Sequence, residues 1–153
     1  MNLTSRAALR TDVMAAEGFR QFPYFDCCGK PFRECKCARQ GKLTIGFGRN
    51  LEDVGIERLE GEVLLDHDLY KAEANATKAF EWFASLTELR QRAIAELVFN
   101  LGIVGFKEFR QTIQSIKAGQ FVAASMNLLA SKWKAQVGPV RSSRIARYLR
   151  DAD

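Results

Sequence analysis

All four cysteines of the chain lie between Cys27 and Cys37, in the spacing C-C-x6-C-x-C. The segment around them is rich in glycine, proline and charged residues, which is typical of a loop. On either side of it, Phe22–Phe25 and Lys42–Ile45 have the aromatic and β-branched residues that favour strands. This segment constrains the fold more than any other, because it predicts two or three short antiparallel strands whose first connection is long and Cys-rich.

The length of 153 residues suits a single domain that covers residues 1–153. Hydrophobic residues make up 47% of the chain and charged residues 27%, so a core can form without cross-links and the cysteines need a local explanation. The formal net charge of +5 fits an anionic partner such as nucleic acid, a membrane surface or a wall polymer. It fits a soluble basic protein equally well, so charge does not separate these classes.

The N-terminus lacks the apolar run of a signal peptide, because Arg6, Arg10 and Asp12 interrupt it. No stretch approaches the roughly 20 apolar residues of a membrane-spanning helix. We therefore expect a protein that is made in the cytoplasm. If it acts elsewhere, another factor must release it.

Most of the remaining chain has helical periodicity. Residues 4–17 place Leu9, Val13 and Ala16 on one face, and Gly18 is positioned to end this helix. The chain from residue 57 onward also has helical periodicity, with breaks at Gly102, near Gly119, and at Gly138 and Pro139. The predicted fold class is therefore α+β, mostly helical, with a small antiparallel β-hairpin lobe.

The predicted organisation is a small β lobe near residues 18–56 and a helical lobe over residues 57–153. The β lobe contains a Cys-rich insertion at 27–41. We expect the N-terminal helix, 4–17, to pack on the helical lobe.

Two carboxylates and a hydroxyl stand out near the predicted strands. Glu17 falls in the last helical turn, where the negative end of the helix dipole favours the protonated form that an acid catalyst needs. Asp26 ends the first strand, and Thr44 lies on the returning strand. Cleavage of a glycosidic bond needs a proton donor and a second group on the opposite face of the sugar. Glu17 and Asp26 are the best-placed pair for these roles.

The run E-G-F-R-Q-F-P-Y-F-D, from Glu17 to Asp26, resembles the active-site start of phage-type (T-even-like) lysozymes, the family 24 glycoside hydrolases. The later T-I-G-F-G motif, which begins at Thr44, is similar to the family's T-I-G-x-G. The run from Phe99 to Gly102 resembles the helix end beside the family's cleft. S-K-W at residues 131–133, followed by Pro139 and Arg141, resembles its C-terminal substrate-side segment. The resemblance covers nearly the whole chain, apart from the Cys-rich insertion.

This resemblance implies a lysozyme-like fold with the β lobe beside the active-site cleft. It also implies an endolysin, or muramidase, that hydrolyses the β-1,4 bond between N-acetylmuramic acid and N-acetylglucosamine in peptidoglycan. Glu17 would be the general acid, while Asp26 and Thr44 would position the attacking water in an inverting reaction. Residues expected to contact the substrate are Tyr24, Phe47, Asn100, Gly102 and Arg141.

The same resemblance implies no metal for catalysis, a monomer, peptidoglycan as the partner and no nucleic-acid partner. It predicts a phage protein that lyses its host. The protein would be made in the host cytoplasm and would act on peptidoglycan in the periplasm after membrane permeabilisation by a separate protein such as a holin.

The cysteines leave three states open. Cys27, Cys28, Cys35 and Cys37 are enough for a tetrahedral zinc site, although the adjacent pair is unlike a C-x2-C knuckle. In an oxidising periplasm, two disulfides could form instead, with Cys27 and Cys28 each pairing to Cys35 or Cys37. Free thiols are the third possibility. Either cross-link would fasten a loop that is too short and polar to be held by packing.

Arginines recur every three residues near the C-terminus, at Arg141, Arg144, Arg147 and Arg150. They predict a solvated helix face, or a basic stripe that contacts anionic wall or outer-membrane polymers.

Two alternatives to an enzyme remain. One is a zinc-knuckle module that binds nucleic acid through the cysteine loop and this stripe, and the other is a non-catalytic relative that binds the cell wall.

Overall fold

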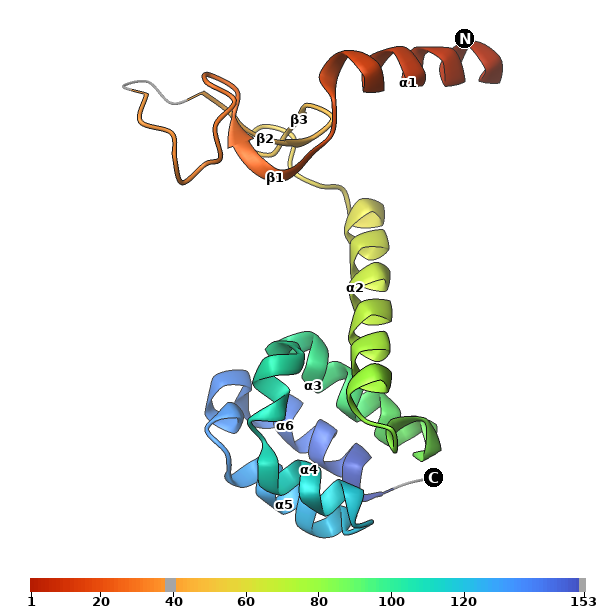
Figure 1. The fold of residues 1–153 in the computed structure, drawn as a ribbon, viewed down its shortest axis with the longest axis vertical. Helices are drawn as coiled ribbons and strands as arrows, with labels where there is room; N and C mark the ends of the chain where they lie inside the picture. The colour runs from red at the N-terminus through yellow and green to blue at the C-terminus, as the bar shows by residue number, and fades with distance from the viewer. Residues whose placement is uncertain (38–40, 152–153) are drawn as a thin grey trace. The chain divides into compact units, whose positions relative to one another are not determined.

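The computed structural model describes residues 1–37 and 41–151. Of the predicted insertion at 27–41, residues 38–40 lie outside the described residues. The chain divides into two compact units, Met1–Gly61 and Glu62–Asp153, here called the N-terminal and C-terminal units. The described residues form six α-helices and one three-stranded antiparallel sheet (Figure 1), which confirms the α+β prediction.

The N-terminal unit begins with α1, Leu3–Glu17. The Asn2 side chain caps this helix by accepting a hydrogen bond of 2.8 Å from the Ser5 amide. The helix ends at Gly18, which has a φ of 67° and donates its N–H to the carbonyl of Met14. A positive φ is easily adopted only by glycine, so the predicted stop is confirmed and Glu17 is the last helical residue.

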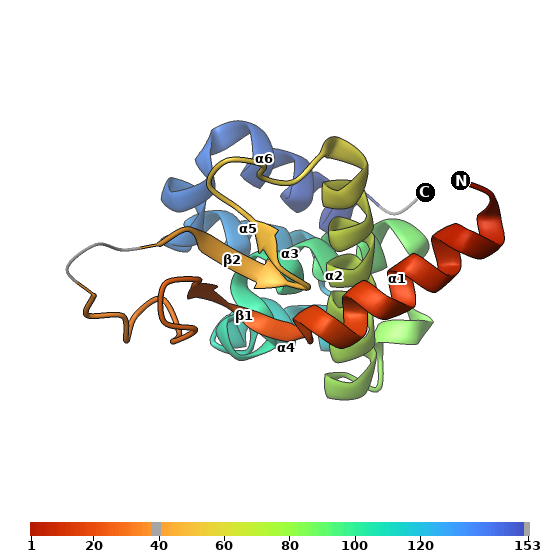
Figure 2. The same cartoon turned by 90° about the horizontal axis from the view of Figure 1, so that it is seen from above.

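Three strands follow: β1 (Arg20–Phe25), β2 (Leu43–Gly46) and β3 (Arg49–Asn50), in the order β1-β2-β3. Pro23 lies in β1, an edge strand, where its missing N–H costs no ladder hydrogen bond. Thr44 on the central strand lies opposite Tyr24 on one side and Asn50 on the other. The neighbouring β1 and β2 are visible in Figure 2.

The Cys-rich segment begins as a tight turn after β1. Gly29, with a φ of 65°, donates its N–H to the Phe25 carbonyl at 2.9 Å. The chain then runs back along the outer edge of β1, where Phe32 donates to the Pro23 carbonyl at 3.2 Å and Phe25 donates to the Lys30 carbonyl at 3.3 Å. The segment therefore covers part of an exposed strand edge.

Helix α2, Arg58–Ala79, starts in the N-terminal unit and continues into the C-terminal unit. The remaining elements are a 3₁₀ turn at Phe83–Ser85, α3 (Glu88–Lys107), α4 (Arg110–Lys117), α5 (Phe121–Ala130) and α6 (Trp133–Arg150). Two of these helices are kinked at glycines with positive φ: α3 at Gly102 (69°) and α6 at Gly138 (80°). Both kinks fall where the sequence predicts a break.

The hydrophobic core lies in the C-terminal unit. Its fully buried side chains include Phe83, Leu97, Phe106, Leu128 and Trp133. Truncation of one such leucine to alanine costs about 2–5 kcal/mol. Among the described residues of the N-terminal unit, only Thr44 is buried. Local hydrogen bonds and ion pairs therefore contribute much of the stabilisation of that unit's structure.

Candidate active site

The Glu17 carboxylate lies against the β2–β3 turn. A Cβ atom placed on Gly48 would come within 3.0 Å of Oε2 of Glu17, while Gly48 itself has a φ of 80°. Glycine therefore serves two purposes at this position: it adopts the turn, and it leaves room for the carboxylate. Glu17 is solvent-exposed.

Asp26 is held by the backbone of Lys42. Its Oδ1 accepts the Lys42 N–H at 2.8 Å, and its own N–H donates to the Lys42 carbonyl at 3.1 Å. Gly41 fits beside this carboxylate only because it has no side chain, since a Cβ there would overlap Oδ1 of Asp26. The hydrogen bonds fix the carboxylate of an otherwise exposed residue at the end of β1.

Thr44 and Asp26 are linked through the backbone carbonyl of Lys42. The Thr44 hydroxyl donates to the Lys42 carbonyl at 3.1 Å, so that oxygen accepts from both Thr44 and Asp26. Thr44 is 5% exposed. Since its single hydrogen is used in this bond, its hydroxyl oxygen can only accept a further hydrogen bond.

The Lys42 side chain is engaged by carboxylates that follow β3. Its Nζ lies 2.7 Å from Oδ1 of Asp53 and 3.8 Å from Oε2 of Glu52. Hydrogen bonding to Asp53 raises the pKa of Lys42, and hydrogen bonding to Lys42 and then Asn50 lowers the pKa of Asp53. This ion pair links the strand that carries Thr44 to the loop after β3.

Arg49 joins the sheet to the start of α2. Its Nε donates to the Gly55 carbonyl at 2.8 Å, and its Nη2 lies 2.8 Å from Oε2 of Glu60. The Glu60 carboxylate also accepts the Glu57 N–H at 2.8 Å. These bonds fix the chain between β3 and α2, and so support the turn that contacts Glu17.

Two predicted substrate residues, Tyr24 and Phe47, belong to the N-terminal unit. The Arg20 guanidinium lies 4.7 Å from the centroid of the half-buried Tyr24 ring. The Phe47 ring is 38% exposed, with its centroid 5.4 Å from that of Phe19. Phe47 also lines an apolar hollow with residues of α1, which are Arg6, Leu9, Arg10, Val13 and Met14.

The other predicted substrate residues belong to the C-terminal unit. Asn100 accepts a 2.8 Å hydrogen bond from Nε1 of Trp133, which fixes its amide oxygen. Gly102 forms the kink of α3. Arg141 forms a 2.9 Å ion pair with Glu96. Glu17, Asp26 and Thr44 thus all belong to the N-terminal unit, whereas Asn100, Gly102 and Arg141 belong to the C-terminal unit.

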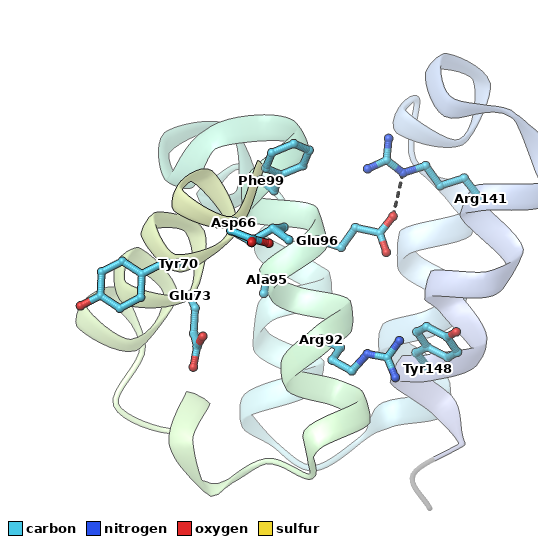
Figure 3. A pocket seen from close by; sticks show the side chains of 10 residues that line it. Asp66, Tyr70, Glu73, Arg92, Ala95, Glu96, Phe99, Arg141 and Tyr148 are labelled. Atoms are coloured by element: carbon cyan, nitrogen blue, oxygen red, sulfur yellow. Dashed lines mark hydrogen bonds and ion pairs between the residues drawn. The ribbon is translucent and has the colours of Figure 1, made fainter. Parts of the chain in front are cut away.

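Arg141 borders a pocket of about 570 Å³ between α2, α3 and α6 of the C-terminal unit (Figure 3). Arg141 and Glu96 point toward one another, and the Arg92 guanidinium lies 5.4 Å from the Tyr148 ring centroid. Acidic, basic and aromatic side chains from three helices thus line this pocket. The lining residues are Asp66, Leu69, Tyr70, Glu73, Arg92, Ala95, Glu96, Phe99, Arg141 and Tyr148.

The C-terminal arginines are mostly paired with carboxylates. Arg144 lies 2.8 Å from the same Glu96 oxygen that pairs with Arg141. Arg150 lies 2.8 Å from Asp151. Arg147 lies 5.7 Å from the Tyr148 ring centroid. The positive charge of the arginine stripe predicted from the sequence is therefore partly neutralised by the carboxylates of Glu96 and Asp151.

The four cysteines converge at the turn after β1. All four Sγ atoms lie within 4.8 Å of one another, and each thiol is free in the structure. Hydrogen bonding with Cys27 and then Cys28 raises the pKa of Cys37 to about 12, whereas a backbone hydrogen bond from Lys30 lowers that of Cys28. The insertion, for which the sequence leaves zinc, disulfides or free thiols open, thus gathers its thiols next to Asp26 in the chain.

Sequence reasoning missed the residues that hold the three candidate side chains in place. Gly41 and Lys42 precede β2, and Gly48 ends the turn after it. Glycines on both sides of a short strand were a signal of close backbone approach. The lysine gave no such signal, because its contribution to Asp26 comes from its backbone.

The model of the phage lysozyme family matches residues 14–148. The match spans the helix end at Glu17, the sheet and nearly all of the helical unit, and the chain belongs to this family. Membership supports peptidoglycan-lysing, muramidase-type activity in general. No curated protein sequence matches the chain. Within the described residues, no helix has the length and apolar character to span a membrane.

Proposed function

We propose that this protein is an endolysin that hydrolyses the β-1,4 bond between N-acetylmuramic acid and N-acetylglucosamine in bacterial peptidoglycan. Family membership supports the class of substrate. The observation that supports the specific proposal is the link between Asp26 and Thr44, which both donate to the Lys42 carbonyl, and the position of Glu17 against Gly48 of the following turn adds to it.

Glu17 is the general acid in this proposal. The oxygen of a departing sugar is a poor leaving group unless it is protonated as the bond breaks. Glu17 is the last residue of α1 and is exposed to solvent, so a sugar oxygen can approach its carboxyl group. Gly48 supports the carboxylate without a side chain that would crowd the sugar.

Asp26 and Thr44 hold the attacking water. Oδ1 of Asp26 is occupied by the Lys42 amide, so the other carboxylate oxygen is the one that would accept a proton from the water. The Thr44 hydroxyl can only accept a further hydrogen bond, so it would accept one from the second hydrogen of the same water. Both contacts leave a lone pair of the water directed at the sugar. We propose an inverting single displacement, for which the two carboxyl groups are expected to stand roughly 6.5–9.5 Å apart.

We propose that Tyr24, Phe47, Asn100, Gly102 and Arg141 contact the substrate. We propose that the enzyme acts on periplasmic peptidoglycan once a separate membrane protein such as a holin has opened the inner membrane. We also propose that it works as a monomer and needs no metal for the chemical step. The C-terminal arginines contribute less to binding of anionic polymers than the sequence suggests, because Glu96 and Asp151 already pair with three of them.

The direct test is loss of turbidity of Gram-negative cells whose outer membrane has been stripped. Glu17→Gln retains the size of the side chain and removes the acidic proton. We expect wild type to lyse the cells and Glu17→Gln to be slower by at least about 10²-fold, the lower range of acid catalysis. Glu57→Gln, a change at another exposed glutamate of the same unit, should lyse like wild type.

Equal lysis by wild type and Glu17→Gln would refute the assignment of the acid. If wild type bound purified peptidoglycan without lysing cells, the protein would be the non-catalytic wall-binding relative. Binding to single-stranded nucleic acid without lysis would instead favour the zinc-knuckle module.

A further inference from the structure

The four thiols of the Cys-rich segment point to one centre rather than to two pairs. Sγ of Cys35 lies 3.7 Å from Sγ of Cys27 and 3.6 Å from Sγ of Cys28. Cys37 completes the group, with all four sulfur atoms within 4.8 Å of one another. Cys35 is thus equally close to two candidate partners.

This spacing matches a tetrahedral metal site. With zinc–sulfur bonds of about 2.3 Å, the edge of the tetrahedron, which is the distance between two ligand sulfurs, is about 3.8 Å. The two short sulfur–sulfur distances fall next to this value. Four sulfur ligands in tetrahedral arrangement are typical of zinc or iron–sulfur centres, and hard cations such as magnesium and calcium prefer oxygen.

A disulfide arrangement fits this geometry less well. Two disulfides would divide the thiols into two separate pairs, whereas Cys35 lies between Cys27 and Cys28. A bond between the neighbouring Cys27 and Cys28 would require a strained backbone. The convergence of all four sulfur atoms has a simple explanation in a single shared ion.

The backbone of the segment presents the thiols in a manner that suits a metal. Cys27 and Cys28 lie in the turn that Gly29 closes, and a backbone hydrogen bond from Lys30 reaches the Cys28 thiol. Hydrogen bonds from the backbone to ligand sulfurs are typical partners that orient metal ligands. The return of the chain along β1 then brings Cys35 back toward the turn.

The charge of the segment also suits such a site. A zinc ion with four thiolates carries a net charge of −2. Between Cys27 and Cys37 there are three basic residues (Lys30, Arg33 and Lys36) and one acidic residue, Glu34, so the side chains sum to +2. The segment therefore compensates the charge that the complex would carry.

A cross-link in the Cys-rich segment would stabilise the N-terminal unit, which has little apolar packing of its own. Its described residues bury no apolar side chain, and the Cys-rich turn is largely exposed. A unit that lacks its own buried apolar core is commonly stabilised by disulfides or a structural metal.

We propose that Cys27, Cys28, Cys35 and Cys37 form a structural zinc site. Binding of one Zn²⁺ replaces the four thiol protons, which are released to solvent, and no oxidation or reduction takes place. The proposal concerns metal binding alone, so it stands whether or not the chain cleaves peptidoglycan.

The site adjoins the residue that we assign to the water. Cys27 follows Asp26 directly, and a Cβ on Gly41 would approach both the Asp26 carboxylate and the Cys27 amide. Metal binding therefore fixes the turn on one side of Asp26, while Lys42 fixes it on the other. Zinc acts on Asp26 through this backbone and has no part in the chemical step.

The test is metal analysis of the full-length protein produced with zinc in the medium and purified under reducing conditions. We expect one zinc per chain. In the presence of a chromogenic zinc indicator, addition of a mercurial should release that zinc in step with modification of four thiols. Replacement of zinc by Co²⁺ should give the sulfur-to-metal charge-transfer absorption of a tetrahedral tetrathiolate site.

Cys37→Ser should weaken zinc binding at least about tenfold, given that even loss of an indirect partner costs 10- to 100-fold. Lys36→Arg, which changes the adjacent exposed residue and keeps its charge, should retain one zinc. The wild-type release experiment does not depend on whether the cysteine variant folds. Four immediately reactive thiols without bound metal would overturn the proposal, as would two disulfides found by mass spectrometry or iron in place of zinc.

Discussion

Oε2 of Glu17 lies so close to Gly48 that a Cβ atom on that glycine would be 3.0 Å away. The last residue of α1 and the turn between β2 and β3 therefore meet at the carboxylate to which we assign acid catalysis. The turn begins only a few residues after Thr44, so a single hairpin supports the proposed acid and the residue proposed to position the water.

Gly48→Ala should impair catalysis more than it impairs folding. The φ of 80° disfavours alanine by about 1–2 kcal/mol, and the new methyl group would push the Glu17 carboxylate. Gly119→Ala is a matched control, because Gly119 has a φ of 71° and no atom within 4 Å of its added Cβ. We expect a similar loss of stability in the two variants and at least a tenfold lower lysis rate for Gly48→Ala alone. Equal rates of lysis would show that the contact is unimportant.

Gly41→Ala should displace Asp26. No positive φ opposes alanine here, but the added Cβ would overlap Oδ1 of Asp26 and lie 2.7 Å from the Cys27 amide nitrogen. We expect lysis to fall by at least about 10²-fold, in line with loss of a positioned proton acceptor. Gly61→Ala is the control, since the nearest atom to its Cβ is 3.8 Å away and alanine favours the helix. Retention of wild-type lysis by Gly41→Ala would contradict the placement of Asp26.

Thr44→Val removes the hydroxyl and nearly retains the volume. The Lys42 carbonyl would keep its bond from Asp26 and lose the one from Thr44, at a cost of about 1 kcal/mol. We expect the rate of lysis to fall by a factor on the order of 10² because the water loses an acceptor. Thr44→Ser restores the hydroxyl and should recover most of the rate. If Thr44→Ser lysed cells no faster than Thr44→Val, the hydroxyl would be dispensable for lysis.

The ion pair between Lys42 and Asp53 predicts a pH dependence of stability. Hydrogen bonding to Lys42 lowers the pKa of Asp53 below its ordinary value of 3.8 in the folded protein. The stabilisation is therefore present above about pH 4 and disappears as the pH falls through the lowered pKa. Lys42, whose pKa is raised above 10.5, loses its contribution only at strongly alkaline pH.

Asp53→Asn should accordingly lower the thermal midpoint at pH 7, and its difference from wild type should shrink as the pH is lowered toward 2. Calorimetric scans of wild type and variant between these pH values measure the difference. Glu34→Gln, a change at an exposed carboxylate of the Cys-rich segment, is the control. A difference that does not shrink toward low pH would show that the pair does not stabilise the fold.

Much of the architecture was predictable from local sequence. Helix α1 ends at Gly18 as predicted, because a glycine after an amphipathic run readily takes the positive φ of a helix end. The strands on both sides of the Cys-rich segment follow from their composition. The kinks at Gly102 and Gly138 also fall at predicted breaks, although the helices continue beyond them.

The contacts that shape the candidate site were not predictable in the same way. The sequence favours Glu17, Asp26 and Thr44 as a set, but it does not reveal that the Lys42 carbonyl joins Asp26 to Thr44, since a backbone oxygen has no sequence signature. The pairing of Arg141 and Arg144 with one carboxylate, Glu96, was equally hidden, because it links residues far apart in the chain.

The most direct test of the proposed function is the product formed from purified peptidoglycan. Wild type should release fragments that end in a reducing N-acetylmuramic acid, and Glu17→Gln should release them at least about 10²-fold more slowly while its circular dichroism is unchanged. New reducing ends on N-acetylglucosamine, or equal release by a folded Glu17→Gln, would contradict the account.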